Sequence, residues 1–242
     1  MAEQRIELAE AGNPAVLKRL KAHPGVAATC DRPGVTGVRF RRGSSWREVR
    51  VGDPRCELKG LVELMDNNPL VCADACSVPD AASTLALIAL GPLASAGVLV
   101  EPPVILTNVP GDPALVNAFL ATEAWARGAT LHFEPIEAKG VADGTAIAIV
   151  RAPERLEELD ELYEERFGRS FYVRRDETSP WDVALVAGKP YALYRLSVAP
   201  EADRCLVTIR AMADLDGKCG ADQVIHAMNV MAGFEEDLGV GI

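Results

Sequence analysis

The sequence predicts an α/β or α+β protein built on a mixed sheet. Helical and strand-like stretches follow one another along the 242 residues, with no internal repeat and no low-complexity linker. Hydrophobic residues make up 49% of the chain and charged residues 25%, as in ordinary globular domains. A chain of this size and composition can form a stable core without disulfides or metals.

The N-terminal stretch is predicted to contain a helix followed by a β-hairpin. Apolar residues recur at helical spacing over residues 5–22, and His23-Pro24-Gly25 ends this helix. Over residues 38–51, apolar residues alternate with arginines on both sides of a turn at Gly43-Ser44-Ser45.

The central stretch is predicted to alternate between apolar helices and short strands. Residues 78–98 predict a helix, because Pro79 suits its first turn and Asp80 suits its dipole. The elements predicted next are a strand at 104–106, a helix at 112–127, and strands at 130–133 and 144–150.

The C-terminal stretch is predicted to begin and end with a helix. A highly charged helix is expected over residues 154–167, because Leu159 and Tyr163 fall on one apolar face. Glycine and proline pairs then separate three apolar strands. These strands are predicted at 181–186, 191–198 and 204–211, and the final helix is predicted at 221–231.

The charge of the chain bears on its partners. A net charge of −10 and a pI of about 4.9 argue against nucleic acids and anionic membranes, which would repel the protein. The apolar residues 85–100 are interrupted by Gly91-Pro92, and the residues after Met1 are polar, so neither a transmembrane helix nor a signal peptide is expected. The six cysteines have no metal-binding spacing. We therefore expect a cytoplasmic protein with reduced thiols and no bound metal.

A group of arginines stands out in this acidic chain. It comprises Arg32, Arg39, Arg41, Arg42, Arg47, Arg50 and Arg55, within and around the predicted hairpin. One interpretation is a site for a phosphate, a carboxylate or an acidic partner surface. The alternative, which we favour, is a solvated outer face whose arginines pair with the protein's own acids.

Several C-terminal segments occur in the order found in one enzyme family. Residues 214–223 read DLDGKCGADQ, and residues 226–236 read HAMNVMAGFEE. These segments resemble the end of N-acetyl-gamma-glutamyl-phosphate reductases, which belong to the semialdehyde dehydrogenases. Weaker similarities lie at residues 85–93, 131–149 and 162–174.

The resemblance implies a fold and a division of the chain. Residues 70–242 would form the catalytic and dimerisation domain, similar to the C-terminal domain of glyceraldehyde-phosphate dehydrogenase. That domain would contain a mixed, largely antiparallel sheet with helices on one face. Residues 1–69 would form a reduced N-terminal region with a helix and the basic hairpin.

The chain departs from the family where a nicotinamide cofactor would bind. Such enzymes hold the pyrophosphate on a glycine-rich turn at a helix N-terminus, and no GxGxxG sequence or close variant is present. The residues before the catalytic-type domain number only about half of what a dinucleotide fold needs. We therefore expect the cofactor domain to be missing or reduced, and no cofactor to be bound.

The catalytic cysteine of the family has two candidate positions here. An alignment without gaps, counted back from Gly91-Pro92, places Ala81 at the cysteine position and removes the nucleophile. An alignment on local sequence places Cys76 there, at the start of the long helix, where the helix dipole would activate a thiolate. We favour the first alignment and keep Cys76 as a candidate nucleophile.

The catalytic histidine of the family also has no direct match. The corresponding residues, 108–113, contain none. His226 lies in the last predicted helix, near the family's active site, and is the candidate base that could pair with a thiolate. The alternative is a packed helix histidine, which we favour.

The resemblance also suggests residues for binding a substrate or anion. Lys218 lies in the family's substrate-side loop, where an ammonium could hold a carboxylate or phosphate. Gln223 matches a family position, and Asp74 lies beside the candidate nucleophile.

These features lead to three hypotheses for function. The first is a degenerate paralogue that has lost NAD(P)-dependent reduction and serves as a dimeric module for binding a small anionic metabolite or a partner. The second is an enzyme that acts on a small acidic or phosphorylated metabolite without its own nicotinamide site. The third, which we favour least, is a reductase that uses the cofactor domain of a partner chain. In each case we expect a homodimer or higher homo-oligomer.

Overall fold

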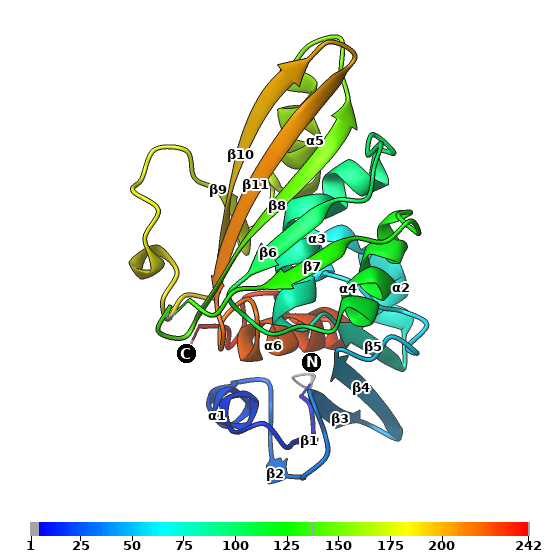
Figure 1. Cartoon of the computed structure of the whole chain (residues 1–242). Coiled ribbons are helices and arrows are strands. Elements are labelled where there is room, and N and C mark those ends of the chain that lie inside the picture. Colours follow the sequence, from blue (N-terminus) through cyan, green and yellow to red (C-terminus); the bar gives the residue numbers. More distant parts are fainter. Residues whose placement is uncertain (1–4, 137, 242) are drawn as a thin grey trace.

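The computed structural model describes residues 5–136 and 138–241, and its elements form two sheets (Figure 1). A small N-terminal sheet lies below a larger C-terminal sheet in this view. Helix α6 (Ala221–Ala232) lies between them, and all twelve of its residues are buried. The last helix of the chain therefore joins the two layers.

The N-terminal sheet has the strand order β2-β1-β3-β4-β5. Strand β1 pairs parallel to β2 but antiparallel to β3, and β4 pairs parallel to β5. The strands are β1 (Leu8–Ala11), β2 (Thr29–Asp31), β3 (Val38–Arg42), β4 (Ser45–Val51) and β5 (Ala75–Val78). The helical segments of this part are α1 (Pro14–Ala22), the 3-10 turn η1 (Val62–Leu64) and α2 (Asn67–Cys72).

The C-terminal sheet has the strand order β7-β6-β8-β11-β10-β9. Its centre is antiparallel, and only the two outer pairs, β6–β7 and β9–β10, are parallel. The strands are β6 (Val104–Thr107), β7 (Thr130–Phe133), β8 (Val141–Arg151), β9 (Val173–Arg175), β10 (Ala192–Glu201) and β11 (Arg204–Asp214). The predicted fold class is confirmed, and a second, smaller sheet accompanies the expected one.

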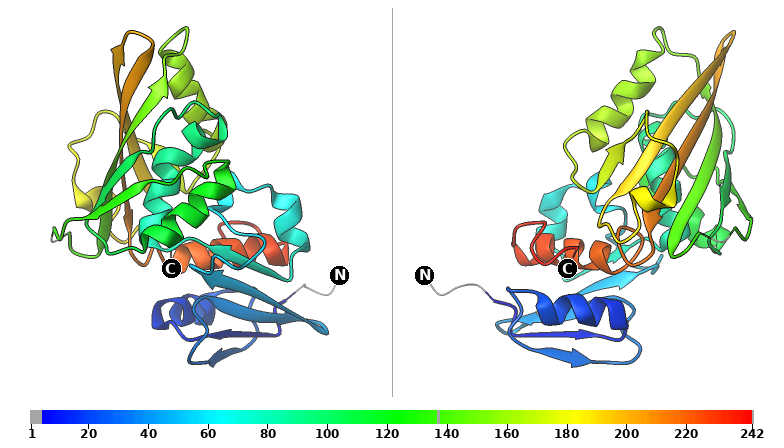
Figure 2. Two further views of the ribbon diagram at one scale, coloured as in Figure 1. Left: turned by 45° about the vertical axis from the view of Figure 1, so that its right-hand side comes forward. Right: turned by 90° about the vertical axis from the view of Figure 1, so that its left-hand side faces the viewer.

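Helices cover one face of the C-terminal sheet (Figures 1 and 2). Helix α3 (Ala81–Ser95) packs on β8 and β11 and is buried along nearly its whole length. Helices α4 (Pro113–Leu120) and α5 (Glu157–Phe167) flank it. The 3-10 turns are η2 (Ala121–Glu123) and η3 (Val183–Leu185). None of the described helices combines the length and the apolar character needed to span a bilayer.

Two sequence predictions of secondary structure are wrong. Residues 5–22 begin with strand β1, and the helix starts only at Pro14. Between them, Gly12 lies against the backbone of residues 32–35. A Cβ at this position would lie 2.7 Å from the carbonyl oxygen of Arg32. Residues 181–186 form the 3-10 turn η3 instead of a strand, because the Asp182 side chain accepts a hydrogen bond from the Ala184 amide.

Candidate functional site

Helix α6 carries polar side chains that are buried yet bonded to other segments. Asp222 pairs with Arg19 at 2.7 Å, and the His23 ring lies 2.9 Å from the Asn229 amide oxygen. The Asn229 amide nitrogen also donates to the carbonyl oxygens of Glu236 and Leu238. These bonds hold residues 234–241, which we call the C-terminal strap, against the helix.

A buried ion pair lies at the start of this helix. The Lys218 ammonium is 2.6 and 2.8 Å from the two carboxylate oxygens of Glu63, and the side chains are only 1% and 5% exposed. Burial acts to raise the pKa of Glu63, but the opposing charges of Lys218 and His226 lower it below its ordinary value. Both charges are needed, because a single buried charge without its partner is costly.

His226 extends this network toward solvent. Its Nε2 lies 3.0 Å from the Glu236 carboxylate. This hydrogen bond is the main cause that lowers the pKa of Glu236. Its Nδ1 lies 3.7 Å from the Glu63 carboxylate and has no hydrogen-bond partner among the described residues. The Tyr172 ring packs against the imidazole with ring centroids 4.2 Å apart. Tyr172 also donates its hydroxyl hydrogen to the Glu236 carbonyl oxygen.

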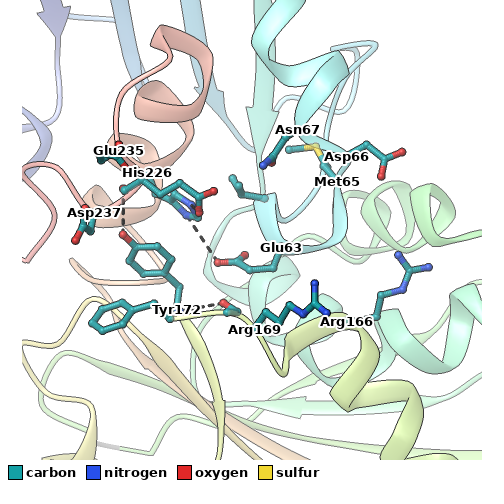
Figure 3. Close-up of a pocket in the computed structure, with 14 residues that line it drawn as sticks. Glu63, Met65, Asp66, Asn67, Arg166, Arg169, Tyr172, His226, Glu235 and Asp237 are labelled. Atoms are coloured by element: carbon teal, nitrogen blue, oxygen red, sulfur yellow. Dashed lines mark hydrogen bonds and ion pairs between the residues drawn. The ribbon is translucent and has the colours of Figure 1, made fainter.

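A pocket of about 690 Å³ opens beside His226 and Glu63 (Figure 3). Its walls come from residues 62–67, from residues 166–172 at the end of α5, and from the strap at residues 235–237. Figure 3 shows Arg166 and Arg169 extending from the α5 end toward the loop that carries Glu63 and Asp66. The volume is within the range of small-molecule sites.

Several charged side chains that line the pocket have no partner within the described part of the chain. Arg166 and Arg169 have no hydrogen bond or ion pair to another described residue, and the same holds for the carboxylates of Asp66, Glu235 and Asp237. Most other arginines of the described chain are paired, as are Arg19, Arg50 and Arg195. All five belong to exposed residues, and the charge of Arg166 also acts on the Glu123 carboxylate, so these charges are solvated at the mouth of the pocket.

The structure places Cys76 away from this pocket. Cys76 lies on strand β5, not at the start of α3, and the first residue of that helix is Ala81. Cys76 is therefore not at the start of α3, where the alignment on local sequence placed it. The Cys76 side chain is fully buried 3.4 Å from the Met231 sulfur, and burial raises its pKa to about 12. The charge of Arg47 acts to lower this pKa, but burial outweighs it, so the thiol is not activated.

The predicted anion-binding residues are not gathered in one site. Lys218 is buried and already neutralised by Glu63. The Gln223 amide is buried too, and donates to the Pro79 carbonyl oxygen at 3.0 Å. Asp74 is exposed beside β5, next to a different surface hollow. Of the predicted site residues, only His226 lines the charged pocket.

The arginines of the hairpin have partners within the protein. Arg42 and Arg47 donate to the carbonyl oxygens of Ala232 and Met231, at the C-terminal end of α6. Cations at that end also complement the helix dipole. Glu10 pairs with Arg32 and is 3.7 Å from Arg39, and Arg41, Arg50 and Arg55 also pair with nearby acids. Arg42 and Arg47 thus stabilise the packing of α6 on the N-terminal sheet.

The N-terminal sheet does not fit a nicotinamide dinucleotide. A pyrophosphate needs free amides at a helix start, but the Asn13 side chain accepts from the amides of Ala15 and Val16, at 2.8 and 3.4 Å. Pro14 has no amide hydrogen to offer. In addition, β3 runs antiparallel to β1, whereas a dinucleotide fold continues with parallel strands. For metals, the described residues contain no cluster of three or more histidine, cysteine or acidic ligands.

Sequence reasoning missed most of the pocket. Glu63, Arg166 and Arg169 were not candidates, because they lie in two segments, about a hundred residues apart, whose meeting is not encoded in any local pattern. Two signals were available. Glu63 is the acid of a short segment between two apolar residues, and Glu236 lies in the closing segment of the family resemblance.

Comparison with known proteins places this geometry in a fold. No known protein family and no curated protein matches the sequence. Among solved structures, aspartate semialdehyde dehydrogenase II from Vibrio cholerae matches with a TM-score of 0.60 and 13% identity, over 95% of this chain and 99% of that one. The same enzyme complexed with ASA matches with a TM-score of 0.59 and 14% identity, over the same shares. The chain thus has a fold similar to that of semialdehyde dehydrogenases.

Proposed function

We propose that this protein binds a small anionic metabolite in the pocket beside His226 and has lost NAD(P)-dependent reduction. The observation that carries the proposal is the unpaired state of Arg166 and Arg169, whose guanidiniums both face the pocket (Figure 3). Guanidiniums bind carboxylates and phosphates through paired, charge-assisted hydrogen bonds. Two such groups on one wall form a receptor for one anionic group.

Three features support the loss of the original reaction. The start of α1 is capped by Asn13 and Pro14, so it offers no pyrophosphate site. Ala81 stands at the start of α3, where the resemblance implies a cysteine. Residues 108–113, where the family has its histidine, have none. The features needed to bind the cofactor, to attack the substrate and to act as the base are thus lost together.

The structural neighbours support the class of ligand. The fold is shared with an enzyme whose name specifies a semialdehyde of an amino acid, and one of its structures holds ASA. We infer that the pocket retained the binding of a small polar metabolite after the chemistry was lost.

The first test is a binding measurement on the full chain. Isothermal titration at low ionic strength with glutarate, inorganic phosphate and NADPH should detect at least one of the two anions and no NADPH. The Arg166→Ala/Arg169→Ala variant should weaken anion binding by about tenfold or more, since each charge-assisted contact contributes about 1.5–3 kcal/mol.

The matched control is Arg151→Ala/Arg155→Ala, two exposed arginines outside the pocket. This variant should bind like the unmodified protein. NADPH binding with micromolar affinity, or equal anion binding by all three proteins, would overturn the proposal.

A further inference from the structure

We propose that the C-terminal strap, residues 234–241, is controlled by a pH-sensitive switch whose titrating group is His23. The neutral ring holds the strap in place, and protonation of the ring releases it. Residues 235–237 of the strap form one wall of the pocket beside His226, so release of the strap would open that wall. The inference goes beyond the proposed function, because it does not depend on what the pocket binds.

Both nitrogens of the His23 ring have partners that require the neutral ring. The Gly25 amide donates to Nδ1 at 3.0 Å, so this nitrogen is an acceptor and carries no hydrogen. Nε2 lies 2.9 Å from the Asn229 amide oxygen and is therefore the nitrogen that donates. A proton added to Nδ1 would face the hydrogen of the Gly25 amide, and this hydrogen bond would be lost.

Asn229 connects this arrangement to the strap. Its amide nitrogen donates to the carbonyl oxygens of Glu236 and Leu238, at 3.1 and 2.7 Å. These two acceptors fix the orientation of the amide group, so the Asn229 oxygen must face His23. Asn229 is fully buried, and a shift of the ring would leave its oxygen without a donor.

The strap also packs directly on the His23 ring. Gly239 lies so close that a Cβ at this position would be 2.4 Å from the His23 Cδ2 atom. The Phe234 ring lies beside the imidazole, with ring centroids 5.7 Å apart. Because His23 is only 2% exposed, a protonated ring would gain hydration by displacing the strap.

No ion pair among the described residues stabilises a protonated His23. The ring is packed between the end of α1, helix α6 and the strap. The charged and titratable groups of these segments are Arg19, Lys21, Asp222, His226, Glu235, Glu236 and Asp237. Arg19 pairs with Asp222, and Glu236 is bonded to His226. Burial is the main cause that lowers the pKa of His23, and the hydrogen bonds of Asn229 and Leu238 oppose it.

The strap is the part of this site that is most easily displaced. All of its residues are described, and they contain no helix or strand. Its internal hydrogen bonds are those of turns, from the Leu238 amide to Glu235 and from the Val240 amide to Asp237. Asn229, by contrast, lies within α6, which is buried between the two sheets. Local opening of the strap is therefore the expected response to protonation.

Hydrogen exchange of the strap amides in the full chain, followed by mass spectrometry, tests the switch. Rates are divided by the intrinsic rate at each pH, so that protection can be compared between pH 7.5 and 5.5. The pKa of His23 is lower in the closed state than its ordinary value of 6.5, so closure weakens as the pH falls below about 6.5. Strap protection should fall several-fold, up to about tenfold.

His226 needs separate treatment in this experiment. A positive charge on His226 would strengthen its contact with Glu236 and thus hold the strap more tightly at low pH. The comparison is therefore made in the His226→Gln protein, with and without a second substitution at His23. Strand β8 provides the internal reference, because its protection should not follow the strap.

His23→Gln is the decisive substitution, because its amide can accept from Gly25 and donate to Asn229 without titrating. Strap protection should then change by less than about twofold between the two pH values. His132→Gln, at an exposed histidine of β7, is the matched control and should keep the full response. An unchanged response in the His23→Gln protein, or no response before it is introduced, would overturn the inference.

A reciprocal test does not require a substitution at His23. Gly239→Ala would push the strap off the ring, because its Cβ would collide with His23. If the strap and the proton compete, displacing the strap must raise the pKa of His23 toward 6.5, as followed by NMR of the ring.

The control for this test is Gly97→Ala. Gly97 has nearly the same backbone angle, φ +66° against +71°, but a Cβ there would meet nothing within 4 Å. This variant should leave the pKa of His23 unchanged. Equal pKa values of His23 in the Gly239→Ala, Gly97→Ala and unmodified proteins would show that the strap and the ring are not coupled.

Discussion

At the scale of single residues, burial decides what each reactive side chain can do. Cys76 has the chemistry of a nucleophile but lies fully buried on a strand, and its pKa is raised to about 12. His226 is equally buried, yet it is bonded at one nitrogen and lines a pocket. A residue type in a suggestive segment is therefore insufficient, because surroundings set protonation and access.

Thiol labelling tests the position of Cys76. In the native protein near pH 8, Cys76 should react far more slowly than Cys72, which lies four residues earlier and is exposed. The reason is that only the accessible thiolate attacks the reagent. Peptide mapping by mass spectrometry after brief treatment with iodoacetamide would show this, and in urea the two rates should become similar. Equal rates in the native protein would contradict the assignment.

At the scale of elements, α6 joins parts of the chain that are distant in sequence. Its C-terminal end accepts hydrogen bonds from Arg42 and Arg47 of the hairpin, and Lys218, just before its start, pairs with Glu63 at η1. The strap returns along the helix and is held by Asn229 and His226. The pocket exists because these contacts bring η1, the α5 end and the strap together.

The Glu63–Lys218 pair predicts a dependence of stability on pH. The pKa of Glu63 is lower in the folded protein than its ordinary value of 4.5. The pair therefore contributes stability above about pH 4.5, and this contribution is lost as the pH falls through the lower, folded pKa. At pH 7, Glu63→Gln should reduce the free energy of unfolding by about 3–5 kcal/mol, because Lys218 stays buried without a counter-charge.

Urea denaturation at pH 7 and pH 3.5 would measure this effect. The difference between the unmodified protein and Glu63→Gln should shrink at the lower pH. Glu57→Gln, at an exposed site of the same region, should change the free energy by less than about 0.5 kcal/mol at both values. A constant difference at both pH values would show that Glu63 is not ionised in the folded protein.

At the scale of the whole molecule, the C-terminal sheet presents one face that no described helix covers (Figure 2). Helices α3 and α5 pack on the opposite face. On the open face, Ile147 and Leu206 are 37% and 41% exposed, and Thr208 and Ile149 lie beside them in the strand register. Apolar side chains on a broad sheet face favour association with a second copy.

Light scattering after size-exclusion chromatography tests whether the protein forms the predicted homodimer. The unmodified protein should have close to twice the mass of the 25.9 kDa chain. Leu206→Asp should shift it to the monomer, since a buried, unpaired carboxylate would oppose the interface. Leu156→Asp is the control, because Leu156 is similarly exposed at 43% but precedes α5 on the other side. A monomeric unmodified protein would rule out the homodimer.

The sequence determined the long elements and the broad class of the fold. Helices α3, α5 and α6 and strands β8, β10 and β11 were predictable, because each is long enough to show its periodicity. Strands β2, β5 and β9 were missed because they have only three or four residues each. A strand that short has too few positions to show a clear alternation of apolar and polar residues. The absence of a glycine-rich turn was also visible in the sequence alone.

Only the tertiary structure decided where the charges lie. The resemblance pointed to Lys218, Gln223 and His226, yet all three are buried in the structure, and Lys218 forms an ion pair with Glu63. Asp66, Arg166 and Asp237 face one cavity, although Asp66 is separated in the sequence from each of the other two by about a hundred residues or more. Ion pairing depends on separations of a few ångströms, and these are set by how α6 packs between the two sheets. No local pattern in the chain encodes them.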